Sequence, residues 1–186
     1  MKSNDDSRVI DSVLAGNSEE FAILVDRYKG LVYTIAYRIL NNREDAQEAA
    51  QDAFVKAYRS LAGFRKDSGF STWLYRIAYN TAVSKKRLKK PAFQNIDDIP
   101  SVKEHTDIPK YDFDALSEKE HILESAMKRI PEEDRVLITL YYLDESNVDE
   151  IHTITGLSKS NVKVKLFRAR KRLQDLISNM TEKSYY

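Results

Sequence analysis

The stretch VDEIHTITGLSKSNVKVKLFRARKRL, residues 148–173, decides the fold of the C-terminal part of the chain. Gly156 suits a tight turn between two short helices. The apolar residues spaced to clamp those helices together are Ile151, Ile154, Leu157 and Val162. Residues 159–172 then contain seven basic side chains and no acidic one. A turn glycine, an apolar clamp and a basic second helix, in this order, predict a helix-turn-helix.

The charge of this second helix predicts a nucleic-acid partner. In a helix-turn-helix the second helix enters the major groove with its N-terminal residues against base edges, while cations farther along neutralise phosphates. The basic residues are Lys159, Lys163, Lys165, Arg168, Arg170, Lys171 and Arg172. The alternative is a basic surface helix that only closes a helical bundle.

The first half of the chain has apolar residues at the spacing of amphipathic helices. One such pattern covers residues 21–39, an alanine-rich one covers 46–61, and a third runs from 73 toward 90. Gly63 follows the second pattern, where a left-handed cap residue is expected. Because no alternating strand pattern occurs anywhere, we predict an all-α protein.

A proline-broken stretch divides the chain. Residues 1–92 carry 16 Lys and Arg against 11 Asp and Glu, residues 93–118 carry 2 against 7, and residues 119–186 carry 12 against 11. The prolines of this region are Pro91, Pro100 and Pro109. We therefore predict two small helical domains, 1–92 and 119–186, joined by a flexible acidic linker over 93–118.

The overall composition narrows the class of protein. The chain has 186 residues, 42% hydrophobic and 32% charged, with a net charge of +1, so electrostatic function must come from local charge segregation. It has no cysteine, which excludes disulfides and thiolate metal sites. No apolar run approaches the ~20 residues of a membrane helix, and the polar start does not resemble a secretory signal. These features predict a cytoplasmic protein without membrane insertion.

Motifs for catalysis are missing. The three histidines are scattered, without the spacing of a metal site, and five dispersed glycines are too few for a phosphate-binding loop. The abundant carboxylates are interpreted as solvated helix surface. We therefore expect no enzyme activity, no metal and no cofactor.

Aromatic and basic residues gather where the third helix begins. They are Phe64, Arg65, Lys66, Phe70, Trp73, Tyr75, Arg76, Tyr79 and Asn80. Unpaired bases are held by stacking on aromatic rings and by backbone-tracking cations, at ~1–3 kcal/mol per stacked base. Single-stranded DNA is therefore a predicted ligand of this segment. Alternatively, Trp73 and some of the tyrosines fill the core.

Four ordered motifs carry a family resemblance. They are FAILVDRY (21–28), DAQEAAQDAFVKAY (45–58), FSTWLYRIAYNTA (70–82) and NVKVKLFRARKRL (161–173). With these motifs the chain resembles the extracytoplasmic-function (ECF) sigma factors of bacterial RNA polymerase, in the sigma-70 family. The resemblance implies an alternative sigma factor with region 2 over residues 1–92 and a region 4 helix-turn-helix over 119–186.

The resemblance also implies residue roles. Residues expected to dock on the clamp helices of the largest polymerase subunit are Asp45, Glu48, Gln51, Asp52 and Phe54. Residues expected to capture and melt the minus-ten element are Arg65, Lys66, Asp67, Ser68, Phe70, Ser71, Trp73, Arg76 and Asn80. Residues expected to contact the minus-thirty-five duplex are Lys159, Asn161, Lys163, Val164, Lys165, Phe167 and Arg168.

Further expectations follow from the resemblance. The partners are core RNA polymerase, including its flap region, promoter DNA and an anti-sigma factor. The acidic linker is expected to lie in the polymerase channel built for RNA, or else to be an ordinary solvated tether. His152 replaces a small residue of the family and is expected to tilt outward or to widen the helix crossing.

Two other classes of protein remain open on the sequence. The first is a stand-alone helix-turn-helix regulator that binds duplex DNA as a dimer without polymerase. The second is a helical scaffold whose basic helix docks on an acidic partner.

Overall fold

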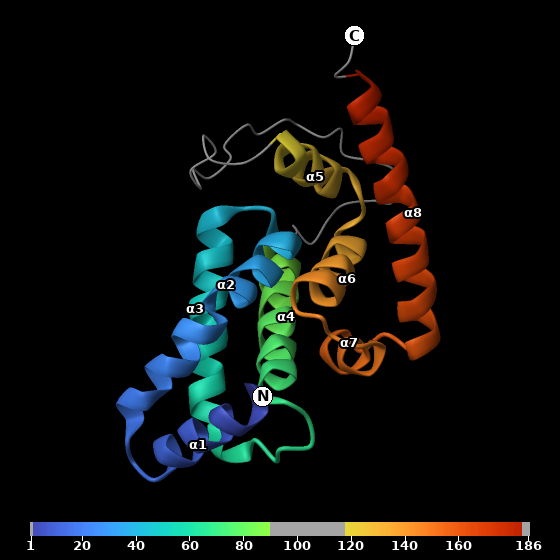
Figure 1. The fold of residues 1–186 in the computed structure, drawn as a ribbon. Helices are drawn as coiled ribbons and strands as arrows, with labels where there is room; N and C mark the ends of the chain where they lie inside the picture. The colour runs from blue at the N-terminus through green and yellow to red at the C-terminus, as the bar shows by residue number, and fades with distance from the viewer. Residues whose placement is uncertain (1, 90–117, 184–186) are drawn as a thin grey trace.

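The computed structural model describes residues 2–89 and 118–183. All regular structure in these residues is helical, with eight α-helices, two short 3₁₀ helices and no strand (Figure 1). The predicted all-α fold is confirmed. The expected linker over 93–118 lies outside the described residues, apart from Glu118 at the start of a helix.

The N-terminal half is a bundle of three long helices with a shorter helix beside it. Its elements are α1 (Lys2–Leu14), η1 (Ser18–Glu20), α2 (Phe21–Leu40), α3 (Arg43–Ser60), η2 (Leu61–Gly63) and α4 (Phe70–Lys89). α3 packs on α2 and α4 through a stripe of buried alanines. Small side chains allow two helices to approach closely, so this stripe brings α4 firmly against the bundle.

The short helix α1 was not predicted from the sequence. It buries Val9, Ile10 and Val13 against the bundle and contacts α2, α4 and η2. Its Asp6 is buried and accepts a hydrogen bond from the Tyr28 hydroxyl at 2.5 Å. The spacing of the three apolar residues is helical, and it is the signal that could have revealed this helix.

The C-terminal half consists of four helices. They are α5 (Glu118–Arg129), α6 (Glu132–Leu143), α7 (Val148–Thr155) and α8 (Lys159–Lys183). α8 packs against each of the other three. α7 and α8 meet at Gly156, whose φ of 76° provides the left-handed turn. The predicted helix-turn-helix is therefore present.

The prediction for Gly63 was wrong. The residue lies in η2 and is not among the glycines with positive φ. The left-handed backbone occurs instead at Lys66, with a φ of 60°. The chain thus leaves α3 through an extra helical turn and reverses direction three residues later.

The two halves pack against one another. α4 contacts α7, and α2 contacts α6 (Figure 1). Buried residues from both halves form a single hydrophobic cluster. Among the described residues, no helix combines the length and apolar character needed to cross a bilayer.

Candidate nucleic-acid interface

Polar contacts join the loop between η2 and α4, residues 64–69, to the elements beside it. Lys66 donates to Asp11 Oδ1 of α1 at 2.9 Å, and Arg65 pairs with Asp67 at 3.2 Å. At the end of the loop, the Trp73 amide donates to the Gly69 carbonyl at 3.2 Å, which starts α4. α1 therefore contacts the loop that was predicted to capture the minus-ten element.

Three aromatic rings cluster behind this loop. The Trp73 ring lies 5.2 Å from the Phe64 ring and 5.7 Å from the Phe70 ring, measured between centroids. Phe70 is only 4% exposed, whereas Trp73 and Phe64 are half-buried. Phe70 thus packs against Trp73 from the buried side of the cluster, and the Trp73 and Phe64 rings both keep part of their surface exposed.

One face of α4 continues from Trp73. Arg76 and Asn80 follow it at helical spacing and are both exposed. Ser68 and Ser71 are half-buried, and Asp67 is exposed. The structure therefore brings an aromatic ring, a guanidinium group and an amide onto one open face. Stacking, phosphate pairing and base hydrogen bonding are all available there.

The acidic residues of α3 are partly engaged within the chain. Asp45 accepts from Lys89 Nζ at 2.5 Å, and Glu48 pairs with Lys85 at 2.7 Å. Both lysines belong to the basic end of α4. A basic partner would therefore compete with this end of α4 for the two carboxylates.

The remaining α3 residues predicted to bind polymerase differ in exposure. Gln51 and Asp52 are exposed, and Phe54 is half-buried. The three share the helix with Asp45 and Glu48, so α3 presents a mixed acidic and amide surface with one aromatic ring at its edge.

The helix-turn-helix is well capped. The Asn147 side chain accepts from the amides of Asp149 and Glu150, and the Glu150 carboxylate accepts from the Asn147 amide at 2.8 Å. This capping box satisfies the free amides at the start of α7. The predicted clamp residues Ile151, Ile154 and Val162 are fully buried, and Leu157 is half-buried.

The His152 side chain contacts the backbone of the turn between α7 and α8. Its Nδ1 lies 2.6 Å from the Leu157 carbonyl oxygen, across the turn between α7 and α8. Because a carbonyl can only accept, Nδ1 must carry the proton in this contact. The expected outward tilt of His152 is not observed, since the half-buried ring contacts the backbone just before α8.

The start of α8 presents an open surface of mixed character. Its exposed residues include Lys163, Val164 at 46% exposure, Phe167 at 65% and Arg168. Lys159 and Asn161 are also exposed. Apolar side chains standing between cations can contact thymine methyl groups while the cations reach phosphates.

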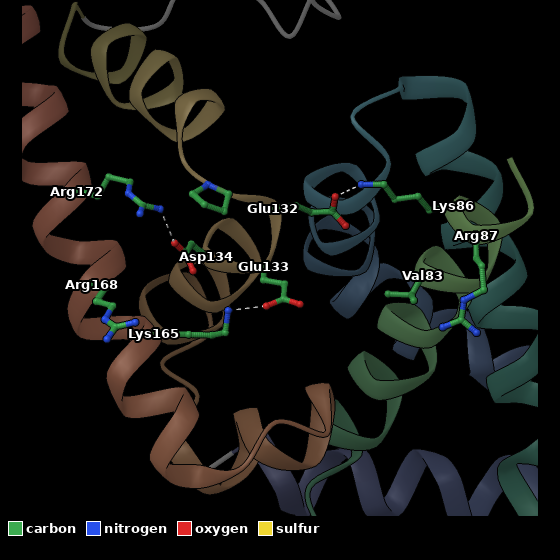
Figure 2. Close-up of a pocket in the computed structure, with 10 residues that line it drawn as sticks. Val83, Lys86, Arg87, Glu132, Glu133, Asp134, Lys165, Arg168 and Arg172 are labelled. Atoms are coloured by element: carbon green, nitrogen blue, oxygen red, sulfur yellow. Dashed lines mark hydrogen bonds and ion pairs between the residues drawn. The ribbon is translucent and has the colours of Figure 1, made fainter. Parts of the chain in front are cut away.

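Acidic residues of neighbouring helices pair with several cations of α8. Lys165 contacts Glu133 at 2.6 Å, and Arg172 contacts Asp134 at 3.2 Å (Figure 2). Lys159 contacts Asp149 of α7 at 2.9 Å. The sequence interpretation missed these pairs, although three consecutive acids, residues 132–134, were visible at the start of α6.

A charged groove of about 580 Å³ lies between the two halves. α4 forms one wall with Lys86 and Arg87, α6 contributes its acidic first turn, and α8 contributes Lys165, Arg168 and Arg172 (Figure 2). The groove is therefore lined by cations from both halves, with carboxylates between them. Within residues 2–89 and 118–183, no group of three His, Asp or Glu side chains is placed to hold a metal ion.

Comparisons with known proteins agree with this arrangement. Residues 24–91 match the family described as Sigma-70 region 2, and residues 120–173 match the family described as Sigma-70, region 4. The chain is 30% identical over 179 residues to "ECF RNA polymerase sigma factor SigW" of Bacillus subtilis, covering 92% of this chain and 96% of the relative. It is 32% identical over 180 residues to the "ECF RNA polymerase sigma-E factor" of Escherichia coli K12, covering 92% and 94%.

Solved structures share the fold. One is CnrH in complex with the cytosolic domain of CnrY, with a TM-score of 0.64 at 22% identity, covering 92% of this chain and 96% of that one. Another is the sigma factor RpoE of Bartonella quintana in complex with the anti-sigma factor NepR, also with a TM-score of 0.64, at 18% identity, covering 86% and 98%. With both family regions matched in order and curated relatives aligned along nearly their whole length, the chain belongs to the ECF sigma factors of the sigma-70 family and is an alternative sigma factor.

Proposed function

We propose that this sigma factor directs core RNA polymerase to its promoters through two surfaces with separate tasks. The N-terminal domain, residues 1–92, anchors to polymerase and opens the minus-ten element. The C-terminal domain, residues 119–186, reads the minus-thirty-five element as duplex, and residues 93–118 connect the two. The observation that carries this division is the open α4 face of Trp73, Arg76 and Asn80, which is distinct from the cationic face of α8.

At the minus-ten element, Trp73 stacks on an extruded base while Asn80 offers hydrogen bonds to its edge. The loop over residues 64–69 supplies Arg65, Lys66, Asp67 and Ser68, and the first turn of α4 supplies Ser71, around that base and its backbone. Extruding a base costs a few kcal/mol, which stacking and hydrogen bonding in a preformed site offset. Phe70 contributes by holding Trp73 in place, because its own ring is buried.

At the minus-thirty-five element, the start of α8 lies in the major groove. Lys163 and Arg168 contact base edges or phosphates, while Val164 and Phe167 contact apolar edges. Lys159, Asn161 and Lys165 line the flanks of the same helix, where phosphates pass. Support comes from the exposure of these side chains, apart from the half-buried Lys165, on a helix that buries Val162, Leu166 and Ala169.

Polymerase binds α3. Basic residues of the clamp helices contact the α3 surface formed by Asp45, Glu48, Gln51, Asp52 and Phe54. The C-terminal domain binds the flap region. An anti-sigma factor is the expected negative regulator, since RpoE of Bartonella quintana was solved with the anti-sigma factor NepR.

Transcription reconstituted from purified components tests this proposal. Core polymerase with this chain should initiate at specific promoters, whereas neither component alone should do so. Trp73→Ala should lower promoter opening about tenfold or more, as expected from ~1–3 kcal/mol of lost stacking, and leave duplex binding unchanged. Asn80→Ala should lower opening several-fold, because about 1 kcal/mol of hydrogen bonding to the base edge is lost, and should also spare duplex binding. Permanganate footprinting measures opening, and gel shift measures duplex binding.

The same experiment separates the alternatives. A stand-alone regulator would bind promoter duplex as a dimer, and core polymerase would not change the start site. A variant of Trp73 that lost duplex binding and opening equally would show a purely structural role and contradict the assignment.

A further inference from the structure

The helix α1 contacts both elements that flank the minus-ten loop, residues 64–69. It touches η2 before the loop and α4 after it, at the end of the bundle where α4 begins (Figure 1). Val9, Ile10 and Val13 are buried and anchor α1 to the bundle. The match to Sigma-70 region 2 begins at residue 24, so α1 precedes the matched segment. Its contacts therefore connect a helix outside that segment to the proposed minus-ten site.

A buried carboxylate of α1 is bonded to two side chains of α2. Asp6 is 3% exposed; its Oδ1 accepts from the Arg27 guanidinium group, and its Oδ2 accepts from the Tyr28 hydroxyl at 2.5 Å. Burial first, and then the hydrogen bond to Asp6, raise the pKa of Tyr28 above its usual 10.0, so the hydroxyl keeps its proton and donates. Because a buried polar group without a partner is costly, this bond favours the observed orientation of the Tyr28 ring.

The Tyr28 ring connects this bond to the aromatic cluster. Its centroid lies 5.7 Å from that of Phe70. Phe70 packs in turn against Trp73 and Phe64, with 5.7 Å between centroids in each pair. Aromatic pairs at such separations prefer particular relative orientations. A rotation of the Tyr28 ring would therefore displace Phe70, the buried ring that contacts Trp73.

A second contact joins α1 to the loop itself. Asp11 accepts from Lys66 Nζ at 2.9 Å, and Lys66 has a left-handed backbone with a φ of 60°. The side chains of Lys66 and Asp11 are 48% and 62% exposed, and exposed ion pairs contribute little to stability. The buried bonds of Asp6 are therefore the stronger connection from α1 to the site.

We propose that Asp6 is a positioning residue for promoter opening, which holds the Trp73 ring in the orientation that stacks on an extruded minus-ten base. It acts through Tyr28 and Phe70, and the inference rests on the proposed function for the role of Trp73. A ring that is already oriented loses less conformational freedom when the base arrives. Without the bond from Tyr28 to Asp6, only the fraction of chains with a correctly oriented ring can stack, and the apparent affinity falls by that fraction.

Three substitutions and one control isolate this bond. Tyr28→Phe removes the hydroxyl and keeps the ring. Asp6→Ala removes the acceptor, whereas Asp6→Asn retains an oxygen that can accept from Tyr28 and should restore part of the effect. Asp26→Asn is the matched control, because the Asp26 side chain is 73% exposed and pairs with Lys29 on the surface of α2.

The first measurement uses Trp73, which is the only tryptophan of the chain, so that intrinsic fluorescence reports on the site itself. Quenching by acrylamide measures how freely solvent reaches the ring in the free chain. The quenching constant should rise in Asp6→Ala and Tyr28→Phe, rise less in Asp6→Asn and stay unchanged in Asp26→Asn. A purely structural role of Asp6 would lower the melting temperature and leave quenching of the folded chain unchanged. Circular dichroism melting verifies that each variant is folded.

The second measurement is promoter opening by the holoenzyme. With core polymerase, Asp6→Ala and Tyr28→Phe should lower permanganate reactivity at the minus-ten element about tenfold, as expected for one lost hydrogen bond to a charged group, and leave minus-thirty-five duplex binding unchanged. The same substitutions added to Trp73→Ala should cause no further loss of opening, because the ring through which they act is absent.

The other outcomes overturn the proposal. An unchanged quenching constant in both Asp6→Ala and Tyr28→Phe would show that the bond does not orient the ring. A higher quenching constant without a loss of opening would show that this orientation does not limit opening. An equally large further loss in the Trp73→Ala chain would show that Asp6 acts independently of the ring. If Asp6→Ala does not fold, Tyr28→Phe carries the same tests.

Failure of the proposed function has a different signature. If Trp73→Ala left opening unchanged, the assignment of Trp73 to the minus-ten base would be wrong. Acrylamide quenching would then still show whether Asp6 orients the ring.

Discussion

His152 shows how one side chain can stabilise the turn that leads into α8. Its Nδ1–H group spans the turn to the Leu157 carbonyl, and Gly156 closes the same turn through its amide, which donates to the His152 carbonyl at 2.8 Å. The residue therefore stabilises the turn twice, once through its side chain and once through its backbone. A small residue at this position would retain only the backbone contact.

Replacing His152 tests that role. His152→Ala should destabilise the C-terminal half by about 1 kcal/mol and weaken minus-thirty-five duplex binding several-fold, because one intramolecular hydrogen bond is lost. His152→Asn should restore most of both, since its side-chain amide can donate from nearly the same place. Thermal melting and fluorescence anisotropy with a duplex measure the two effects. Equal behaviour of the Ala and Asn variants would contradict the role of the bond.

For single residues, the sequence predicted backbone conformation better than it predicted contacts between distant side chains. Gly156 is the left-handed residue of the turn as expected, because only local backbone geometry decides it. Gly63 was wrongly assigned the same role, since η2 extends the helical path and moves the reversal to Lys66. The pair Arg38–Glu124 joins residues 86 positions apart, and no local pattern encodes such a distant partner.

Among the elements, α6 and α8 form an electrostatic pair. The first turn of α6 carries Glu132, Glu133 and Asp134, where the helix dipole favours negative charge. Two of these carboxylates face Lys165 and Arg172 of the recognition helix (Figure 2). A phosphate that bound Lys165 or Arg172 would have to compete with the carboxylate that already pairs with that cation.

Removing one such carboxylate should strengthen DNA binding. Glu133→Gln should raise affinity for the minus-thirty-five duplex several-fold at low salt, because Lys165 becomes available to a phosphate without a competitor. The gain should shrink as salt rises, as for any interaction with the DNA backbone. Anisotropy titrations at several salt concentrations measure it.

The control for this prediction is Glu19→Gln. Glu19 is exposed on η1 of the N-terminal half, so its replacement changes the net charge equally without affecting α8. An equal gain in both variants would indicate a general charge effect and exclude the specific competition.

The element boundaries were largely predictable, whereas their partners were not. Amphipathic spacing located α2, α3, α4 and α8 closely, because that period reports which face of a helix is buried. The same period does not predict which other helix covers that face. The short α1 was overlooked among polar residues, and its hold on the minus-ten loop through Asp11 and Lys66 became visible only in three dimensions.

At the scale of the whole molecule, bonds between the two halves accompany their apolar packing. α4 packs on α7 and α2 packs on α6, and Arg38 of α2 donates two hydrogen bonds to the Glu124 carboxylate of α5. The Tyr75 hydroxyl of α4 donates to Asp144, which follows α6. Two titratable groups, Glu124 and Tyr75, therefore lie where the halves meet.

Titration of Glu124 and Tyr75 makes the stability of the folded chain depend on pH. Burial alone would raise the pKa of Glu124, but the hydrogen bonds and charge of Arg38, with Lys128 and Arg135 nearby, outweigh burial and lower the pKa below its ordinary value. A lowered carboxyl pKa stabilises the folded chain above the ordinary value, and that stabilisation is lost as pH falls through the lowered pKa. Burial first, and then Asp144, raise the pKa of Tyr75 above its usual 10.0. That contribution is complete below pH 10 and is lost as pH rises further.

The free energy of unfolding should therefore stay constant across neutral pH and fall at both extremes. Glu124→Gln should remove part of the acid-side decrease, because glutamine does not titrate, and Tyr75→Phe should remove part of the alkaline decrease in the same way. Urea denaturation followed by circular dichroism at each pH measures the free energy of unfolding. If both variants kept the wild-type profile, the pH dependence would belong to other groups.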